Sequence, residues 1–273
     1  MTSPVGLIAG RGALPVAIAE GARRAGRSVV CVSVQDADAR LAALSEASYT
    51  VAPGELGAMI AALRRHDVRE VLLAGKVDKL AALRVARLDA EGARAARRMA
   101  DLRDASILDV LVRALEEAGL QVGEQARYIG DLLPAAGVVG RRPPSPEESE
   151  DIRLGLRIAG GMAGLDVGQA VAVHRGVVLA VEAAEGTDAM IRRAGRLAGR
   201  CVVVKVSRPD QDPRYDLPVV GPQTIDVLAA SGGTALAVEA GRTVLVERGR
   251  CVAAADAAGI AVVAVPPQAL RSA

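Results

Sequence analysis

The sequence has almost no aromatic residues: its 273 residues include no Phe, no Trp and only three Tyr. The core must therefore be built from Ala, Val, Leu and Ile, which favours closely packed α/β layers over an aromatic-rich β-sandwich. The scarcity of aromatic rings also removes the platforms on which nucleic-acid bases stack. Since the net charge is only +2, we expect the protein to bind no nucleic acid.

Three further absences narrow the chemistry. Cys31, Cys201 and Cys251 are widely spaced and form no CxxC pair, which favours buried reduced thiols over a zinc site or disulfides. The two histidines are isolated and no Gly-x-Ser-x-Gly motif occurs, so a Ser or Cys nucleophile is a poor hypothesis. No apolar run reaches about 18 residues, and the start of the chain lacks a signal-peptide pattern. We therefore expect a cytoplasmic protein without a transmembrane segment.

Lysine is also rare, since only three of the 34 basic residues are Lys. Two of them, Lys76 and Lys205, each follow an apolar, strand-like run. Ligands of α/β sheets bind at the carboxyl ends of strands, where a lysine supplies a point charge for phosphate. We interpret both as candidate phosphate ligands; a solvated strand end is the alternative.

The first half of the chain alternates strand-like and helical segments. We expect helices over residues 14–25 and 54–66, and strands over residues 5–9, 28–34, 48–51 and 70–76. This rhythm predicts a Rossmann-like, doubly wound parallel sheet. Residues 79–118 have a helical pattern, and residues 121–123 open a further strand.

Residues 137–146 contain three prolines and two arginines without apolar periodicity, which is typical of a linker. We therefore predict an N-terminal domain over 1–136 and an α/β catalytic domain over 147–273. In the second domain a helix is expected to begin near Ser149. The remaining predicted elements are helices over 187–197, 223–230 and 253–258, and strands over 169–173, 177–181, 201–206, 234–239, 243–246 and 260–265.

A glycine turn, Gly10-Arg11-Gly12, follows the first predicted strand. It presents backbone N–H groups where a phosphate or nucleotide would bind. The turn does not match GxGxxG, because Pro15 stands at the third glycine position. A purely structural turn therefore stays open beside a ligand-binding one. Asp78, just after Lys76, extends the candidate site at this edge.

Residues 181–190, with the sequence VEAAEGTDAM, place acidic side chains and a glycine where a strand meets a helix. We predict Thr187 as the N-cap, with Asp188 in the first turn. A helix N-terminus attracts phosphate, and carboxylates such as Glu185 beside a phosphate need a cation, commonly Mg²⁺. The alternative is a capped helix without a site.

The polar loop over residues 207–216 and the helix that follows Pro222 add Asp216 and Asp226. The loop lacks the regular spacing and distal Glu of an EF-hand. Joint metal binding by these acidic turns is a hypothesis, and metal-activated water attacking a phosphate is the corresponding chemistry. Gln169, before a predicted strand, is a candidate for hydrogen bonds to a sugar or base, with a simple turn as the alternative.

Several segments resemble, in order, the LpxI family of UDP-2,3-diacylglucosamine pyrophosphatases. The most specific are VEAAEGTDAM (181–190) and YDLPVVGPQT (215–224), and the others are LIAGRGALP (7–15), GKV (75–77) and LDVGQAV (165–171). The resemblance spans nearly the whole chain. Tyr215 stands where the family is expected to have Phe, and Arg11 where a small residue is commoner.

The resemblance implies Mg²⁺-dependent hydrolysis of UDP-2,3-diacylglucosamine to UMP and 2,3-diacylglucosamine 1-phosphate (lipid X) in lipid A biosynthesis. Water is expected to attack the phosphorus next to the sugar, with the ligand between a Rossmann-like domain and an α/β domain. The resemblance also implies a catalytic aspartate, for which Asp226 matches best and Asp188 and Asp216 are alternatives. The expected metal ligands are Asp226, Asp188, Glu185 and Asp216. The expected substrate-binding residues are Gly10, Gly12, Lys76, Asp78, Gln169, Thr187 and Lys205.

A glycolipid substrate suggests transient contact with the inner-membrane face. Arginines within residues 84–103 are candidates for that contact, although a solvated helix face is the simpler interpretation. A homodimer is a further open expectation. Two other functions also stay open: another nucleotide-sugar or NAD-dependent enzyme, and a non-enzymatic module that binds a nucleotide-linked lipid.

Overall fold

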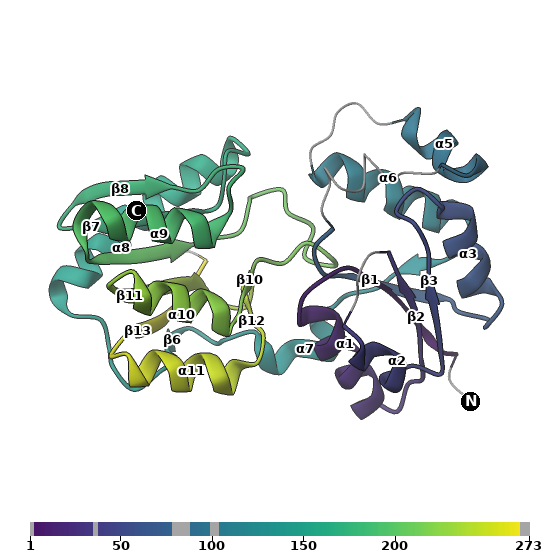
Figure 1. Cartoon of the computed structure of the whole chain (residues 1–273), viewed down its shortest axis with the longest axis horizontal. Coiled ribbons are helices and arrows are strands. Elements are labelled where there is room, and N and C mark those ends of the chain that lie inside the picture. Colours follow the sequence, from purple (N-terminus) through teal and green to yellow (C-terminus); the bar gives the residue numbers. More distant parts are fainter. Residues whose placement is uncertain (1–2, 35–37, 78–87, 99–103, 268–273) are drawn as a thin grey trace. The chain divides into compact units, whose positions relative to one another are not determined.

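The computed structural model describes residues 3–34, 38–77, 88–98 and 104–267. The chain folds into two compact units (Figure 1). The N-terminal unit comprises Met1–Gly130 together with Pro213–Tyr215, and the C-terminal unit comprises Asp131–Asp212 and Asp216–Ala273. The domain bounds expected from the sequence, at residues 136 and 147, stay a prediction.

The N-terminal unit is built on a five-stranded, all-parallel sheet with the order β3-β2-β1-β4-β5. Its strands are β1 (Val5–Ala9), β2 (Val29–Ser33), β3 (Ala47–Thr50), β4 (Glu70–Ala74) and β5 (Gln121–Val122). Its helices are α1 (Leu14–Arg24), α2 (Arg40–Leu44), α3 (Leu56–Arg64), α5 (Ala90–Ala96), α6 (Asp104–Glu117) and α7 (Ala126–Ile129). A short 3-10 turn, η1 (Gly130–Leu132), follows α7.

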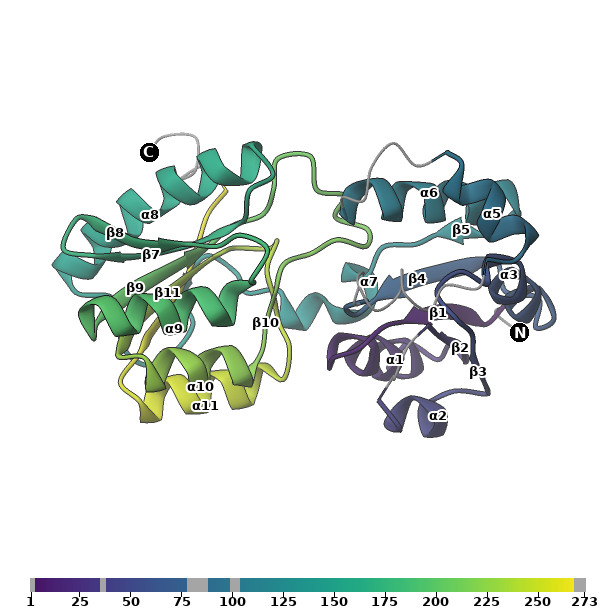
Figure 2. The ribbon, with the colours of Figure 1, turned by 45° about the horizontal axis from the view of Figure 1, so that its top comes forward.

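Helices cover both faces of this sheet. Figure 2 shows α1 and α2 on one side and α5 and α6 on the other. The strands β1 and β2 are buried along their whole length, which explains why they are continuous apolar runs rather than alternating ones. The apolar side chains of α3 and α6 pack against β2 and β4 in one core cluster.

The C-terminal unit contains a six-stranded mixed sheet with the order β6-β13-β11-β9-β7-β8. Strands β9, β11 and β13 are parallel, whereas β6, β7 and β8 each pair antiparallel with their neighbour. The strands are β6 (Gly137–Val138), β7 (Ala170–His174), β8 (Val177–Val181), β9 (Cys201–Lys205), β11 (Gly233–Glu239) and β13 (Ala261–Val265). Two short strands, β10 (Val219–Val220) and β12 (Val244–Leu245), pair parallel in a separate sheet.

Helix α8 (Pro146–Gly164) covers one face of this sheet, where it forms a core with β7 and β9. The opposite face carries α9 (Thr187–Ala198), α10 (Pro222–Ala230) and α11 (Arg248–Ala257). The two units together confirm the predicted class, an α/β protein with a Rossmann-like parallel sheet and a second α/β domain.

Several predicted bounds in the C-terminal unit are wrong. Helix α8 begins at Pro146 rather than near Ser149, because Ser145 and Glu148 form a reciprocal capping box. Helix α11 begins at Arg248, five residues before the predicted start. The strand expected over 243–246 is present but shorter, since β12 comprises only Val244–Leu245 and pairs with β10. Within the expected linker, Gly137–Val138 form an edge strand of the sheet.

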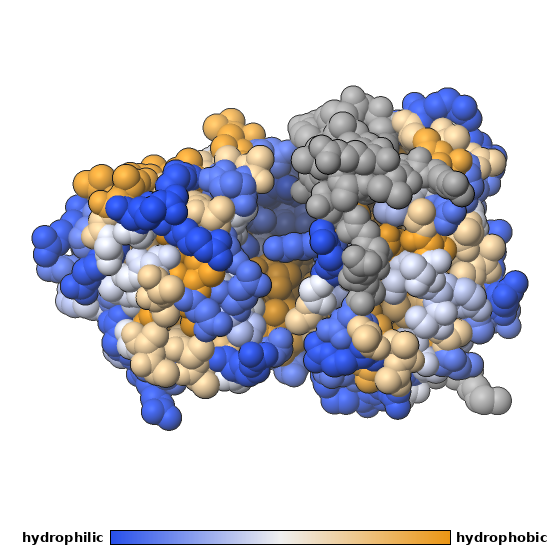
Figure 3. All heavy atoms as spheres, viewed as in Figure 1, coloured by the Kyte–Doolittle hydropathy of each residue, from blue (hydrophilic) through white to orange (hydrophobic). Residues whose placement is uncertain are grey.

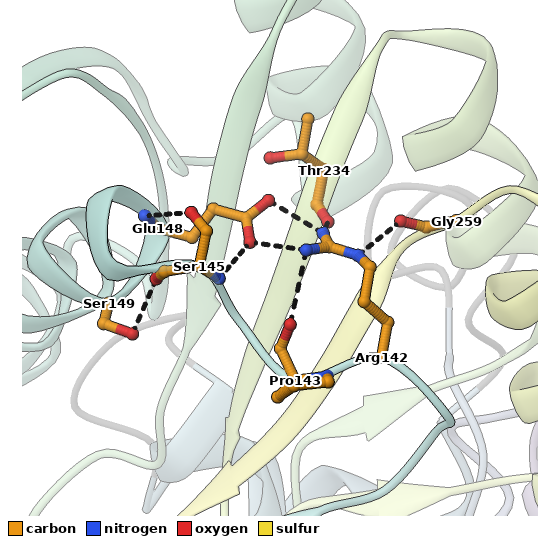
Figure 4. A network of polar contacts seen from close by, with 7 residues as sticks. All are labelled: Arg142, Pro143, Ser145, Glu148, Ser149, Thr234 and Gly259. Carbon is orange, nitrogen blue, oxygen red and sulfur yellow. Dashed lines mark hydrogen bonds and ion pairs between the residues drawn. The ribbon is translucent and has the colours of Figure 1, made fainter.

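The segment before α8 is fixed by Arg142, whose guanidinium donates five hydrogen bonds (Figure 4). Two of its nitrogens donate to the two carboxylate oxygens of Glu148, each at 2.8 Å, and Nε donates to the carbonyl of Gly259 at 2.8 Å. Burial alone would raise the pKa of Glu148. The hydrogen bonds from Arg142 and the Ser145 N–H outweigh burial and lower that pKa to about 2.

The three cysteines are free and buried, as predicted. Burial raises the pKa of Cys201 to about 11, so its thiol stays protonated and unreactive at neutral pH. No helix within the described ranges is both long and apolar enough to cross a membrane.

Candidate functional site

The carboxyl edge of the N-terminal sheet contains the predicted glycine turn. Strands β1 and β4 are neighbours, and the chain leaves β1 toward β2 on the other side, so this is the topological switch point at which α/β sheets bind ligands. The loops after the two strands pair there, because Arg11 N donates to Lys76 O and Lys76 N donates to Arg11 O, both at 2.9 Å.

This pairing explains the first glycine of the turn. A Cβ atom on Gly10 would lie 2.6 Å from the Lys76 carbonyl oxygen, so any side chain there would separate the two loops. Gly12 has a φ of +104° and faces open space. The structure therefore brings Gly10, Gly12 and Lys76 to one edge, and the Lys76 side chain is exposed. Asp78 lies outside the described residues.

Gln125, which the sequence analysis missed, is fully buried at the same edge. Its side-chain nitrogen donates to the carbonyl oxygens of Leu73, in β4, and Tyr215, and its backbone N–H donates to the carbonyl of Arg214. Its Oε1 atom has no hydrogen-bond partner within the described part of the chain. A buried acceptor of this kind needs a water molecule or ligand.

A second edge, in the C-terminal sheet, gathers most of the other predicted residues. Strands β8, β9 and β11 end at the edge where β7 begins, because β7 is antiparallel to β8 and β9. The helix α9 also begins there, directly after the turn that follows β8. The edge therefore contains Gln169, Glu182, Thr187 and Lys205.

Thr187 links a buried carboxylate to a buried ammonium. Its hydroxyl donates to Glu182 Oε1 at 2.6 Å and accepts from Lys205 Nζ at 3.1 Å. Lys205 Nζ also donates to the Val219 carbonyl at 3.1 Å, and Gln169 N donates to Glu182 Oε2 at 3.2 Å. Glu182 and Lys205 are each only 8% exposed, so their opposite charges compensate each other through the hydroxyl.

The predicted role of Thr187 as N-cap is wrong. Gly186 is the N-cap of α9, with a φ of 83° that favours glycine, and Thr187 is the first helical residue. The Thr187 hydroxyl binds Glu182 instead of a backbone N–H, and no side chain of the described residues caps α9. The first-turn N–H groups thus keep the capacity to bind an anion.

The four predicted metal ligands have separate surroundings. Asp188 accepts a hydrogen bond from the Thr224 hydroxyl at 2.9 Å, which links the first turns of α9 and α10. Glu185 pairs with Arg193 and Asp216 with Arg208, both at 2.5 Å. Asp226 is exposed in the second turn of α10.

Asp226 does not lie on the face of α10 that reaches Asp188. It follows Thr224 by two positions, which corresponds to a rotation of about 200° around a helix. Burial, and to a smaller extent the negative charges of Glu247 and Asp226, raise the pKa of Cys251, in α11, to about 11.

No group of three His, Cys, Asp or Glu side chains able to hold a metal ion occurs among the residues that the structure describes. The four carboxylates therefore do not form the joint cluster that the sequence suggested. Mg²⁺ in phosphate-processing sites is commonly bound by one or two carboxylates, with substrate phosphates and water completing its shell. A site of that kind needs no cluster of three carboxylates.

Exposed apolar side chains lie near this edge and along β8. Leu165 and Val167, in the loop before Gln169, are 78% and 49% exposed. Val177 and Val178, in the edge strand β8, are also exposed, and Figure 3 shows apolar surface over that strand. The C-terminal unit therefore offers apolar surface beside its polar edge.

Comparison with known proteins places the chain in a family. Models of the LpxI N-terminal domain and the LpxI C-terminal domain match residues 4–132 and 135–263. A curated protein of Caulobacter vibrioides, named UDP-2,3-diacylglucosamine pyrophosphatase LpxI, is 36% identical over 279 residues, which cover 97% of this chain and 98% of that protein.

Solved structures give weaker similarity. A UDP-glucose-4-epimerase from Stenotrophomonas maltophila has 18% identity and a TM-score of 0.29, with 53% of this chain and 40% of that chain covered. The biotin carboxylase subunit of a pyruvate carboxylase has 13% identity and a TM-score of 0.26, with 63% and 35% covered. These scores are too low to support any inference about function. The two domain matches and the full-length similarity establish that the chain belongs to the LpxI family.

Proposed function

We propose that the protein hydrolyses the pyrophosphate bond of UDP-2,3-diacylglucosamine, releasing UMP and 2,3-diacylglucosamine 1-phosphate for lipid A biosynthesis. The full-length similarity to the Caulobacter protein of that name supports the substrate. The hydrolysis would proceed by attack of water on the phosphorus next to the sugar, with UMP as the leaving group.

The observation that carries the proposal is the start of α9 at the carboxyl edge of the C-terminal sheet. Its first-turn N–H groups have no side-chain cap, and Lys205 lies beside its first residue. Partial positive charge at a helix N-terminus and a nearby ammonium both favour a phosphate. Glu182 and Thr187 would hold the Lys205 ammonium in place. This ammonium and the first-turn N–H groups would stabilise the negative charge that develops on the phosphate during hydrolysis.

Asp188 and Asp216 are the residues that we propose for Mg²⁺. When bound, the ion would act as a Lewis acid on the phosphate and lower the pKa of a water molecule. Glu185 is a further candidate, ion-paired with Arg193 as Asp216 is with Arg208. Asp226 lies on a different face of α10 from Thr224, the partner of Asp188, so we do not include it among these ligands.

The remaining substrate contacts are also proposals. At the switch point of the N-terminal sheet, Gly12 would contribute its backbone N–H group and Lys76 its charge. Gly10 would contribute by letting the two loops approach each other, since its own N–H donates to the Ala74 carbonyl. Gln169 immediately follows the loop with exposed Leu165 and Val167, which suits a ligand that combines a polar head with acyl chains. Contact with the inner-membrane face and a homodimer stay predictions.

Release of UMP by the purified protein tests the proposal. The protein is incubated with UDP-2,3-diacylglucosamine in Mg²⁺ or in EDTA, and UMP is separated and quantified. We expect release in Mg²⁺ that chelation abolishes. Binding of the substrate without release under any divalent metal would instead favour the non-enzymatic module, and conversion that requires NAD would favour the dehydrogenase-type alternative.

A further inference from the structure

Arg208 lies between two carboxylates that come from different segments of the C-terminal unit. Its Nη1 atom is 3.1 Å from Asp166 Oδ1, and its Nη2 atom is 2.5 Å from Asp216 Oδ2. The Arg208 side chain is only 15% exposed, whereas most arginines in ion pairs of this chain are far more exposed. A guanidinium with both ends engaged and little solvent contact has a fixed position.

The backbone around Arg208 is fixed as well. Arg208 N donates to Gln211 Oε1 at 2.9 Å, and Gln211 N donates to the Arg208 carbonyl at 3.3 Å. The Gln211 side chain is buried. Further along, Asp216 N donates to the Asp212 carbonyl at 3.0 Å. The backbone of residues 208–212, and Asp216 with it, therefore has a defined shape within the C-terminal unit.

Asp166, the second carboxylate partner of Arg208, is also held in a defined backbone conformation. Asp166 has a φ of 55°, a left-handed conformation that Asp tolerates better than most residues. It belongs to the loop that continues into Gln169, whose backbone N–H binds Glu182. Through Asp166, the position of Arg208 is thus tied to the same edge that contains Thr187 and Lys205.

We propose that Arg208 is the positioning residue for Asp216. It would hold the Asp216 carboxylate at the place where the proposed hydrolysis requires it, with Asp166 as the second anchor. This inference rests on the proposed function, in which Asp216 is one of two Mg²⁺ carboxylates. Lysine would be a poor substitute, because its single ammonium cannot reproduce two contacts from opposite ends of a planar fork.

A double-mutant cycle in activity is the test. Arg208→Ala should lower kcat by at least about tenfold with a much smaller change in KM, as expected when a transition-state contact is misplaced. If Arg208 acts through Asp216, the double variant with Asp216→Ala should be no slower than Asp216→Ala alone. Guanidinium ion at low, non-denaturing concentration should restore part of the activity of Arg208→Ala, and Arg208→Lys should retain less than half.

Arg153→Ala is the matched control, since Arg153 pairs with Glu150 at 2.5 Å on the exposed face of α8. It should keep wild-type kcat and should not respond to guanidinium. Activity of Arg208→Ala within twofold of wild type, or additive effects of the two substitutions, would overturn the inference. If Arg208→Ala does not fold, undiminished kcat in Arg208→Lys would also overturn it.

Failure of the proposed function can be distinguished from failure of this inference, because the wild-type protein itself would then release no UMP. In that case the wild-type protein, Arg208→Ala, Asp216→Ala and the double variant are compared by urea unfolding. Non-additive losses of stability for positions 208 and 216 would support the positioning contact, and additive losses would contradict it.

Discussion

Thr187 is the side chain on which the proposed phosphate edge depends. Replacement by Val keeps its shape but removes the hydroxyl between Glu182 and Lys205, two groups that are each 8% exposed. We expect Thr187→Val to lower the free energy of unfolding by about 1–3 kcal/mol, because buried polar groups lose their partner. Thr187→Ser should recover most of this loss. Urea denaturation measures both, and equal stability of all three proteins would contradict the network.

Asp188 and Asp226 give opposite predictions for activity. Asp188 lies in the first turn of α9 and is bound by Thr224, whereas Asp226 is exposed on another face of α10. We expect Asp188→Ala to reduce kcat by about a hundredfold or more, and Asp226→Ala to change it by less than about threefold. Steady-state rates of UMP release by both variants measure these changes in kcat. The reverse order would restore Asp226 as the catalytic candidate.

How far these residues could be predicted depends on the range of the interaction. The stretch 181–190 was predictable as a strand, a turn and a helix because apolar runs and glycine act locally. The contact of Thr187 with Lys205 was not, since the two residues are 18 positions apart and meet only because β7 pairs with both β8 and β9. For the same reason, the ion pairs of Arg208 with Asp166 and Asp216 could not be predicted from the sequence, which shows only an arginine in a polar loop.

The start of α8 is the clearest case in which a helix end determines stability. Ser145 and Glu148 form a capping box, and Arg142 pairs with the Glu148 carboxylate (Figure 4). The pKa of Glu148 is lowered to about 2 in the folded protein. Since an unfolded Glu titrates near 4.5, this contribution to stability is complete above about pH 5 and is lost as the pH falls toward 2.

We therefore expect Glu148→Gln to lower the free energy of unfolding by on the order of 2 kcal/mol at pH 7, and much less near pH 2.5. Urea titrations at both pH values measure this difference. Glu150→Gln is the control, because Glu150 pairs with Arg153 at the surface, where ion pairs contribute little. A loss for Glu148→Gln that is independent of pH would contradict the assigned pKa.

Helix and strand identities were largely predictable, because β1, β8 and α9 have strong apolar periods and glycine or proline at their ends. Strand β10 was not, because two residues are too few for a period to be recognised. The strand expected over 243–246 contains β12, but its pairing with β10 could not be predicted. The start of the last helix was also missed. Helix α11 begins with Arg248, Gly249 and Arg250, a start that lacks the usual capping residues.

The assignment of Pro213–Tyr215 to the N-terminal unit has a consequence for the whole chain. Gln125 donates hydrogen bonds to the carbonyls of Arg214 and Tyr215, and Tyr215 packs against the N-terminal core. A fragment of residues 1–130 lacks these partners, so a buried amide would be left unsatisfied. We expect its free energy of unfolding to fall by about 2–4 kcal/mol relative to the same unit in the full chain.

Amide hydrogen exchange on both proteins measures this effect at β4 and α7. The control is Arg214→Ala in the full chain, which removes a side chain but leaves both backbone acceptors in place. Equal protection in the fragment and the full chain would contradict a structural role for the segment. Local sequence could not predict this arrangement, because nothing in a short polar loop specifies a partner about ninety residues away.

The central claim is that the beginning of α9 binds the pyrophosphate. The most direct test is a titration of the ¹⁵N-labelled protein with inorganic pyrophosphate and Mg²⁺, followed through backbone amide chemical shifts. We predict saturable shifts at Gly186, Thr187 and Asp188, which weaken in Thr187→Val. Unchanged resonances at these three amides, with saturable shifts elsewhere in the chain, would contradict the account.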